Sequence, residues 1–229
     1  MVYRKQVAAL DKGLGLGPHA VAPVRIPFGG TPMAAYVIPA QGFDAGRIAL
    51  SGWSLGGHLA PRAASGEPRI AALIADPGTW SIADGFRRVI QHSFGVPAEA
   101  VADLGAMAQP LMDKLDAVVR ADPALRWKVV QRGFWVHGVA DLRGYLASAE
   151  LFTMKGRAED IRCPTLITQA ENDILAADAG NFYEALCCPK TLMRFTAAEG
   201  ADGHCEMGNR SLLNHRVLDW LDEQFDVRG

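Results

Sequence analysis

The sequence has no long apolar run and no concentration of basic residues. Its 229 residues include 23 Lys plus Arg against 25 Asp plus Glu, which gives a formal charge of -2. Without a basic stripe, nothing in the composition indicates a nucleic-acid partner. Without a continuous apolar stretch of about 20 residues, no segment predicts a helix that crosses a membrane. We therefore expect a protein that binds neither nucleic acid nor a membrane.

Cysteine is also scarce, with four residues: Cys163, Cys187, Cys188 and Cys205. The adjacent pair does not suit a disulfide framework, and no Cys-x-x-Cys pair predicts a zinc site. The first 16 residues lack the sustained apolar segment of a secretory signal. We expect reduced thiols and a cytoplasmic location.

Short β-favouring segments alternate with helical patterns over much of the chain, which is long enough to bury one core. Strand patterns cover 24–28, 33–38, 47–51, 70–75, 164–169 and 190–195. The first two flank the turn Gly29-Gly30-Thr31-Pro32 and predict a hairpin. The others alternate with helices, which predicts an α/β fold: a mostly parallel sheet with helices on both faces.

Residues 80–154 interrupt this alternation with apolar residues at helical spacing and three prolines. We interpret this segment as a helical lid inserted over the carboxyl edge of the sheet. The predicted division is therefore 1–79 for the first part of the core, 80–154 for the lid and 155–229 for the second part. The closing helix, 209–225, is expected to turn Leu213 and Leu218 inward with its other apolar residues.

The strongest chemical signal is Gly52-Trp53-Ser54-Leu55-Gly56, which lies between a predicted strand and a predicted helix. A nucleophilic serine needs its hydroxyl at the tip of such a sharp turn, and the glycines on both flanks are expected to let the turn close. The N–H of Leu55, at the start of the helix, is the candidate donor to an oxyanion. The competing interpretation is a structural turn with an inert serine.

A nucleophilic serine needs a base, and the base needs an orienting acid, in the chain order Ser, Asp or Glu, His. Asp173 follows the strand at 164–169, and His204 follows the strand at 190–195. Both lie at the carboxyl ends of strands, the edge that also carries Ser54. Ser54, Asp173 and His204 are therefore the predicted catalytic residues. Two alternatives remain: Glu171 is a rival acid, and Asp173 could simply cap a helix.

Five further residues are weaker candidates for substrate binding: Trp53, Asp76, Trp80, Phe134 and Trp135. Asp76 ends a strand and is either an additional acid of the site or a turn former before proline. The aromatic residues either line an apolar pocket under the lid or pack between helices.

Three blocks of sequence resemble one branch of the α/β-hydrolase superfamily: 44–64 around the elbow, 161–166 with 171–173 around Asp173, and 195–206 around His204. The branch contains 2,6-dihydroxypseudooxynicotine hydrolase and the fungal heptaketide-shortening hydrolases, and its bacterial members are often labelled as dipeptidyl aminopeptidases or acylaminoacyl-peptidases. The resemblance covers about residues 22–226. It implies a Ser54–His204–Asp173 triad that works without a cofactor. The substrate would be an ester, an amide, or a ketone whose C–C bond breaks to release an enolate.

The chain departs from this branch before the elbow. Ile48 follows Ile38 by only ten positions, where members of the branch have a strand, a helix, a second strand and a second helix. They also have a helical domain before the hairpin. The missing segment normally supplies a second oxyanion N–H. Its absence predicts a truncated sheet, whose open edges favour pairing with a second copy of the chain.

The leading functional hypothesis is a serine hydrolase that cleaves an ester or an activated C–C bond in a small, mainly apolar carbonyl compound. The alternative is a non-catalytic or weakly active relative with an incomplete oxyanion hole, which would act as a binding or oligomeric protein. A peptidase ranks third.

Overall fold

The computed structural model describes residues 22–28, 31–37, 44 and 46–226. The chain divides into two units, 1–45 and 46–229. In the first unit, β1 (Ala22–Phe28) and β2 (Thr31–Val37) pair in antiparallel fashion, with Phe28 opposite Thr31. This confirms the predicted hairpin, whose turn residues Gly29 and Gly30 lie outside the described residues.

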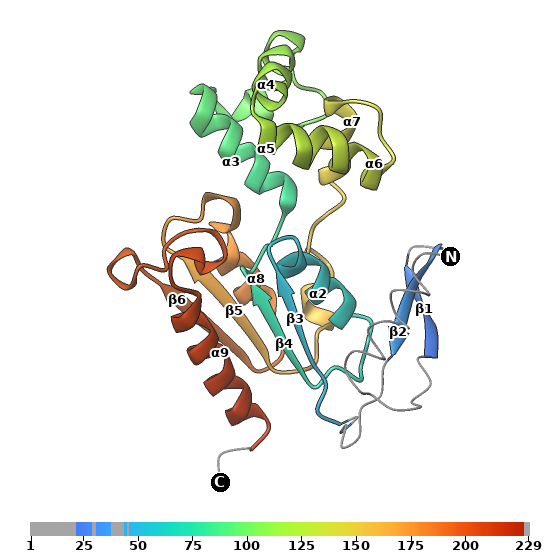
Figure 1. The fold of residues 1–229 in the computed structure, drawn as a ribbon, viewed down its shortest axis with the longest axis vertical. Coiled ribbons are helices and arrows are strands. Elements are labelled where there is room, and N and C mark those ends of the chain that lie inside the picture. The colour runs from blue at the N-terminus through green and yellow to red at the C-terminus, as the bar shows by residue number, and fades with distance from the viewer. Residues whose placement is uncertain (1–21, 29–30, 38–43, 45, 227–229) are drawn as a thin grey trace. The chain divides into compact units, whose positions relative to one another are not determined.

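Four parallel strands form the sheet of the second unit (Figure 1). In sheet order they are β3 (Ala49–Trp53), β4 (Ala72–Asp76), β5 (Thr165–Ala170) and β6 (Lys190–Phe195). Each begins within two residues of its predicted start, so the predicted parallel sheet is confirmed. Within the described residues β3 pairs only with β4 and is an edge of this sheet.

The helical elements of the second unit, in chain order, are α2 (Gly56–Ala64), α3 (Ile82–Phe94), η1 (Ala98–Val101), α4 (Gln109–Ala121), α5 (Pro123–Leu125), the π-helix η2 (Arg126–Gly133), α6 (Phe134–His137), α7 (Leu142–Ala149), η3 (Ala158–Asp160), η4 (Ile174–Ala176), α8 (Ala179–Ala185), η5 (Ala197–Glu199), η6 (His204–Asn209) and α9 (Arg210–Gln224). No helix in the part of the chain that the structure describes has the length and apolar character needed to cross a membrane.

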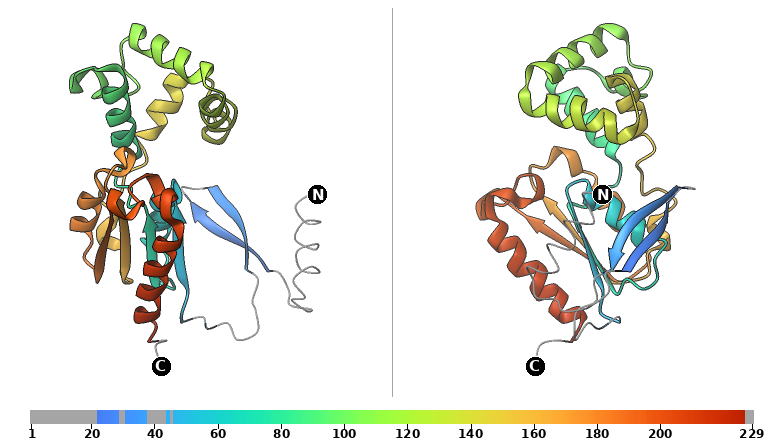
Figure 2. Two further views of the ribbon diagram at one scale, coloured as in Figure 1. Left: turned by 60° about the vertical axis from the view of Figure 1, so that its left-hand side comes forward. Right: turned by 45° about the vertical axis from the view of Figure 1, so that its right-hand side comes forward.

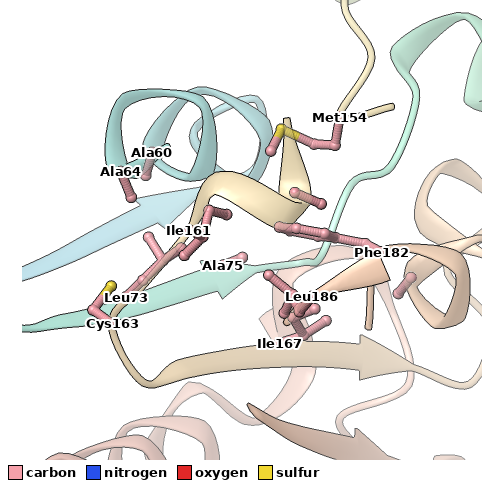
Figure 3. Packing of buried hydrophobic residues seen from close by; sticks show 12 residues of the cluster. Ala60, Ala64, Leu73, Ala75, Met154, Ile161, Cys163, Ile167, Phe182 and Leu186 are labelled. Carbon is pink, nitrogen blue, oxygen red and sulfur yellow. The ribbon is translucent and has the colours of Figure 1, made fainter. Parts of the chain in front are cut away.

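One face of the sheet packs against α2 and α8 (Figure 3). Successive strand residues point to opposite faces, so Leu73 and Ala75 of β4 contribute to this side together with Ile167 of β5. Ala60 of α2 and Phe182 of α8 belong to the same buried cluster. This layer brings the helix after Ser54 against the strands that carry the other candidate residues.

The opposite face of the sheet is covered by α9 (Figure 2). Ala72 and Ile74, which alternate with the residues just described, join Leu166 and Trp220 in a second buried cluster. With helices on both sides of a parallel sheet, the second unit has the predicted layered architecture.

The elements from α3 to α7 lie between β4 and β5 in the chain and form a helical segment with its own core. Its buried residues are Ala83, Ile90, Val101, Leu104, Met107, Met112, Phe134, Leu142, Leu146 and Ala149. Arg88 of α3 ties this segment to the loop after β5, because its guanidinium donates to the carbonyls of Ile174 and Leu175 and to Asp178. The role of 80–154 as a lid, and the division into 1–79, 80–154 and 155–229, stay predictions.

The inward orientation expected for Leu218 is wrong: 57% of this residue is exposed. An α-helix turns about 100° per residue, so five residues place Leu218 about 140° around α9 from Leu213. Seven residues place Trp220 within about 20° of Leu213. The sheet lies along one side of α9 and therefore buries Leu213 and Trp220 but leaves Leu218 in solvent.

This geometry predicts that the same leucine-to-alanine substitution lowers the free energy of unfolding by different amounts at two positions of α9. Leu213→Ala removes a buried side chain and should lower the free energy of unfolding by about 2–5 kcal/mol. Leu218→Ala should change it by less than about 0.5 kcal/mol. Urea unfolding followed by circular dichroism measures both values, and equal losses would contradict the packing of α9 described above.

Candidate active site

Ser54 occupies a sharp turn between β3 and α2. Its φ of 58° is in the left-handed region, which costs a residue with a side chain roughly 1–3 kcal/mol. The Ser54 N–H donates a 2.7 Å hydrogen bond to the carbonyl oxygen of Asp76 at the end of β4. That bond fixes the turn to the neighbouring strand and holds the serine at its tip.

Two glycines allow the turn to close, but only one of them was expected. A Cβ at Gly52 would lie 1.9 Å from the carbonyl oxygen of Gly56, and a Cβ at Gly57 would lie 2.0 Å from that of Pro77. A Cβ at Gly56 would meet nothing within 4 Å. The expectation that Gly56 prevents a clash is therefore wrong, because the close approach of α2 to the loop after β4 is made at the next residue.

The structure brings Ser54, His204 and Asp173 together. Ser54 Oγ lies 3.0 Å from His204 Nε2, and His204 Nδ1 lies 2.8 Å from Asp173 Oδ2. An ionised carboxylate only accepts hydrogen bonds, so Nδ1 donates to Asp173. In the neutral ring, Nε2 then carries a lone pair that faces the serine hydroxyl.

The loops that follow β5 and β6 are held together beside this site. The backbone N–H of Asn172 donates to the carbonyl of Asp202 at 2.9 Å, and the side-chain amide of Asn172 donates to the Asp202 carboxylate at 2.7 Å. These two bonds join the loop of Asp173 to the loop of His204. The alignment of acid and base thus depends on contacts between segments that are 30 residues apart.

Both carboxylate oxygens of Asp173 accept hydrogen bonds, one for each interpretation that the sequence left open. Its Oδ1 accepts from the N–H of Leu175 and caps η4, while its Oδ2 accepts from His204. The rival acid Glu171 is engaged elsewhere, since its carboxylate accepts from the N–H of Ala197 at 2.8 Å. Of the two acids, the structure places Asp173 on the imidazole.

Neighbouring groups raise the pKa of His204. Its hydrogen bond to Asp173, and then the side chain of Cys205, raise the pKa of His204 above the ordinary 6.5, although partial burial opposes this. A raised pKa makes the imidazole a stronger proton acceptor. The Asp173 side chain is almost entirely buried, which strengthens its electrostatic effect on the ring.

Leu55 stands at the N-terminal end of α2, as its N-cap residue. Backbone N–H groups in the first turn of a helix have no intrahelical acceptor and point along the positive end of the helix dipole. Leu55 follows Ser54 directly, so its amide lies next to the serine. Its role as an oxyanion donor stays a prediction.

Asp76 is buried and heavily bonded. Its Oδ1 accepts from the hydroxyl of Thr168 at 3.2 Å, and its Oδ2 accepts from the guanidinium of Arg210 at 2.8 Å. The same guanidinium donates to the carbonyl of Cys205 and stacks over the ring of Trp53, 4.6 Å from its centroid. Arg210 therefore connects Asp76, the loop of His204 and the elbow.

The sequence did not point to Arg210 or to its neighbour Glu206, which is fully buried next to Asp76. A buried glutamate is unusual unless it is paired. Only the position of Glu206, two residues after His204, could have drawn attention to it.

The aromatic candidates lie in different surroundings. Trp53 is half-exposed beside Ser54, and Trp80 is partly buried against the cluster between the sheet and α2. Phe134 is buried in the core of the helical segment, whereas 81% of Trp135 is exposed. Their substrate-binding roles stay predictions. In the described residues, no three His, Cys, Asp or Glu side chains are grouped as metal ligands.

A family model described as X-Pro dipeptidyl-peptidase (S15 family) matches residues 37–204, which include the elbow, Asp173 and His204. The chain belongs to the S15 family. Its second unit has the α/β-hydrolase fold that the resemblance implied, and the solved structure of VinJ aligns with a TM-score of 0.50 and 14% identity, over 79% of this chain and 67% of that one.

Curated relatives of this S15-family chain include two fungal hydrolases. Hydrolase LUC6 from a Fusarium species is 28% identical over 83% of this chain, and 20-hydroxy-prefusarin hydrolase FUS2 from Gibberella moniliformis is 29% identical over 84%. The chain spans only 46% of the length of each. The crystal structure of 2,6-dihydroxy-pseudo-oxynicotine hydrolase aligns with a TM-score of 0.48 and 17% identity, over 94% of this chain and 71% of that one.

The contact between Asp173 and His204 predicts a shift that does not depend on turnover. Asp173→Asn removes the charge that raises the pKa of His204, so this pKa should fall toward 6.5. NMR titration of the His204 ring measures it. Glu171→Gln is the matched control and should leave the value unchanged.

The contact between Asp173 and His204 should also make the stability of the fold depend on pH in a defined direction. Because the folded-state pKa of His204 is raised, its stabilising contribution is complete below the unfolded pKa of about 6.5 and is lost as the pH rises through the folded pKa. The difference in thermal midpoint between the natural chain and Asp173→Asn should therefore be largest near about pH 5–6 and shrink at alkaline pH. A similar effect in Glu171→Gln would contradict the assignment of Asp173 as the partner.

Proposed function

We propose that this chain is a serine hydrolase in which Ser54 is the nucleophile, His204 the general base and Asp173 the residue that orients the base. The observation that carries this proposal is the pair of hydrogen bonds linking Ser54 Oγ to His204 Nε2 at 3.0 Å and His204 Nδ1 to Asp173 at 2.8 Å. These contacts occur on a strained turn, at the carboxyl edge of the sheet. Turn and contacts together match the requirements of an activated serine.

In the first half of the reaction, Ser54 Oγ attacks a carbonyl carbon of the substrate while its proton moves to His204 Nε2. Negative charge develops on the carbonyl oxygen, and the amide of Leu55 at the start of α2 is the proposed donor to it. Asp173 stabilises the imidazolium that forms and keeps its Nε2–H directed at the reacting atoms.

In the second half, the tetrahedral intermediate collapses to an acyl-enzyme and His204 gives its proton to the leaving group. For an ester, the leaving group is an alkoxide. For a β-diketone, the C–C bond breaks, its electron pair forms an enolate, and the proton restores the ketone. Water then attacks the acyl-enzyme, with His204 as base, and releases the acid.

The surroundings of the triad favour a small, mainly apolar substrate. Trp53 precedes the nucleophile and Met207 follows His204 by three residues, and 54% and 59% of these residues are exposed. Large apolar side chains left in solvent next to reactive polar groups are typical of ligand sites. The name of FUS2 states that this relative acts on 20-hydroxy-prefusarin. We therefore place carbonyl compounds of small-molecule metabolism first among the substrate classes.

A chemical label tests the nucleophile. A fluorophosphonate should label the folded protein at Ser54, and Ser54→Ala should abolish the label. Ser51→Ala is the matched control, because this exposed serine lies only three residues away on β3. His204→Ala should slow labelling by roughly 10⁴-fold or more, as for other triad members. A folded but unlabelled natural chain would instead support the non-catalytic alternative.

A substrate panel tests the bond that is cleaved. The family description favours a second candidate, a dipeptidyl-peptidase that removes X-Pro dipeptides. We expect p-nitrophenyl esters or aryl β-diketones to be cleaved with a kcat/KM at least about tenfold above that of X-Pro p-nitroanilides. Faster cleavage of the anilides, lost in Ser54→Ala, would favour the peptidase.

A further inference from the structure

Glu206 is an unusual residue for a loop that carries a catalytic base. Its side chain is fully buried, and neither carboxyl oxygen makes a well-formed hydrogen bond. An ionised carboxylate without partners in such a place costs several kcal/mol, so a neutral carboxylic acid is strongly favoured. The triad does not use Glu206, and its burial therefore needs another explanation.

A second carboxyl group lies beside it. Burial, and then the neighbouring Asp76 carboxyl, raise the pKa of Glu206 to about 9. Asp76 is already held by Thr168 of β5 and Arg210 of α9. Two carboxyl groups in one buried place cannot both ionise cheaply, so Glu206 keeps its proton while Asp76 pairs with Arg210.

The backbone of this loop is strained directly after the base. Cys205 and Glu206 have φ values of 56° and 50°, both in the left-handed region. Two bonds hold this conformation: Glu206 N–H donates to Gly203 at 2.8 Å, and Arg210 donates to the carbonyl of Cys205 at 2.8 Å. Left-handed non-glycine residues persist only where the surroundings fix them. The side chain of Glu206 is fully buried within this loop.

We propose that Glu206 is a positioning residue, a neutral acid paired with Asp76 that anchors the strained loop and so holds His204 in line with Ser54. Asp76 is the common point: its carbonyl binds the N–H of Ser54, and its carboxylate binds Arg210. The pair therefore links the elbow to the loop of the base. The positioning role rests on the proposed function of His204, whereas the protonation state of Glu206 does not.

Loss of the proton from Glu206 should disturb this arrangement at alkaline pH. The titratable or charged groups that face it are Asp76 on β4 and Arg210 on α9, together with Cys205 and His204 on its own segment. Thr168 on β5 adds a neutral hydroxyl. Once Glu206 ionises, two carboxylates share one arginine, and the repulsion between them favours release of the loop.

Glu206→Gln tests the pair because glutamine keeps the shape and a donor but never ionises. A raised folded-state pKa means that the neutral Glu206 contributes fully below the unfolded pKa of about 4.5, and this contribution is lost as the pH rises to about 9. The thermal midpoint of Glu206→Gln minus that of the natural chain should therefore increase from about pH 5 to about pH 9. The matched control Glu67→Gln, outside the site, should show no such trend. A constant difference for Glu206→Gln would overturn the pair.

The positioning role has its own readouts. The ring of His204 has its own titration, near a pKa of about 10, in every variant. Above about pH 9 its resonances in the natural chain and in Glu67→Gln should depart from that simple titration, whereas in Glu206→Gln they should follow it. The rate of Ser54 labelling in Glu206→Gln, relative to the natural chain, should rise about tenfold one pH unit above the pKa of Glu206. Equal behaviour of the two proteins in both measurements would overturn the positioning role. If no protein is labelled at any pH, the proposed hydrolase function fails, and the midpoints and the His204 resonances still decide the inference on Glu206.

Discussion

The site depends on the end of β4, where the backbone and the side chain of Asp76 bind different partners. The carbonyl of Asp76 accepts the N–H of Ser54 and holds the serine in a left-handed conformation that it would not adopt alone. Its carboxylate accepts from Arg210, which in turn holds the carbonyl of Cys205 next to His204. One residue at the carboxyl end of β4 thus connects Ser54 to the loop of His204. If Asp76 moved, both would lose a fixed point.

The parallel sheet explains why these residues meet at all. Parallel strands place their carboxyl ends at the same edge, so the segments after β3, β4, β5 and β6 emerge side by side. Ser54, Asp76, Asp173 and His204 lie at or after these four ends. The remaining alignment comes from contacts between loops, above all the bonds from Asn172 to Asp202.

Several features could be predicted because they are recorded in local sequence. The strands were evident from short β-favouring runs bounded by turn residues, and the elbow from Gly52-Trp53-Ser54. The exposure of Leu218 could not be predicted as reliably, because its apolar character does not indicate which side of α9 faces the sheet. The sequence also could not show that the turn needs a glycine at Gly57 rather than at Gly56, because that need depends on how closely α2 approaches Pro77.

The sequence by itself determined the fold class and the family, and it predicted a triad of Ser54, His204 and one of two acids, because strand and helix periodicity and the order Ser, Asp or Glu, His are properties of the chain. Only the tertiary structure decided which acid faces His204, since Glu171 and Asp173 differ by two residues in sequence but bind different partners. It also decided that Glu206 is buried against Asp76. This burial brings together groups that are more than 100 residues apart, and no local pattern records such a contact.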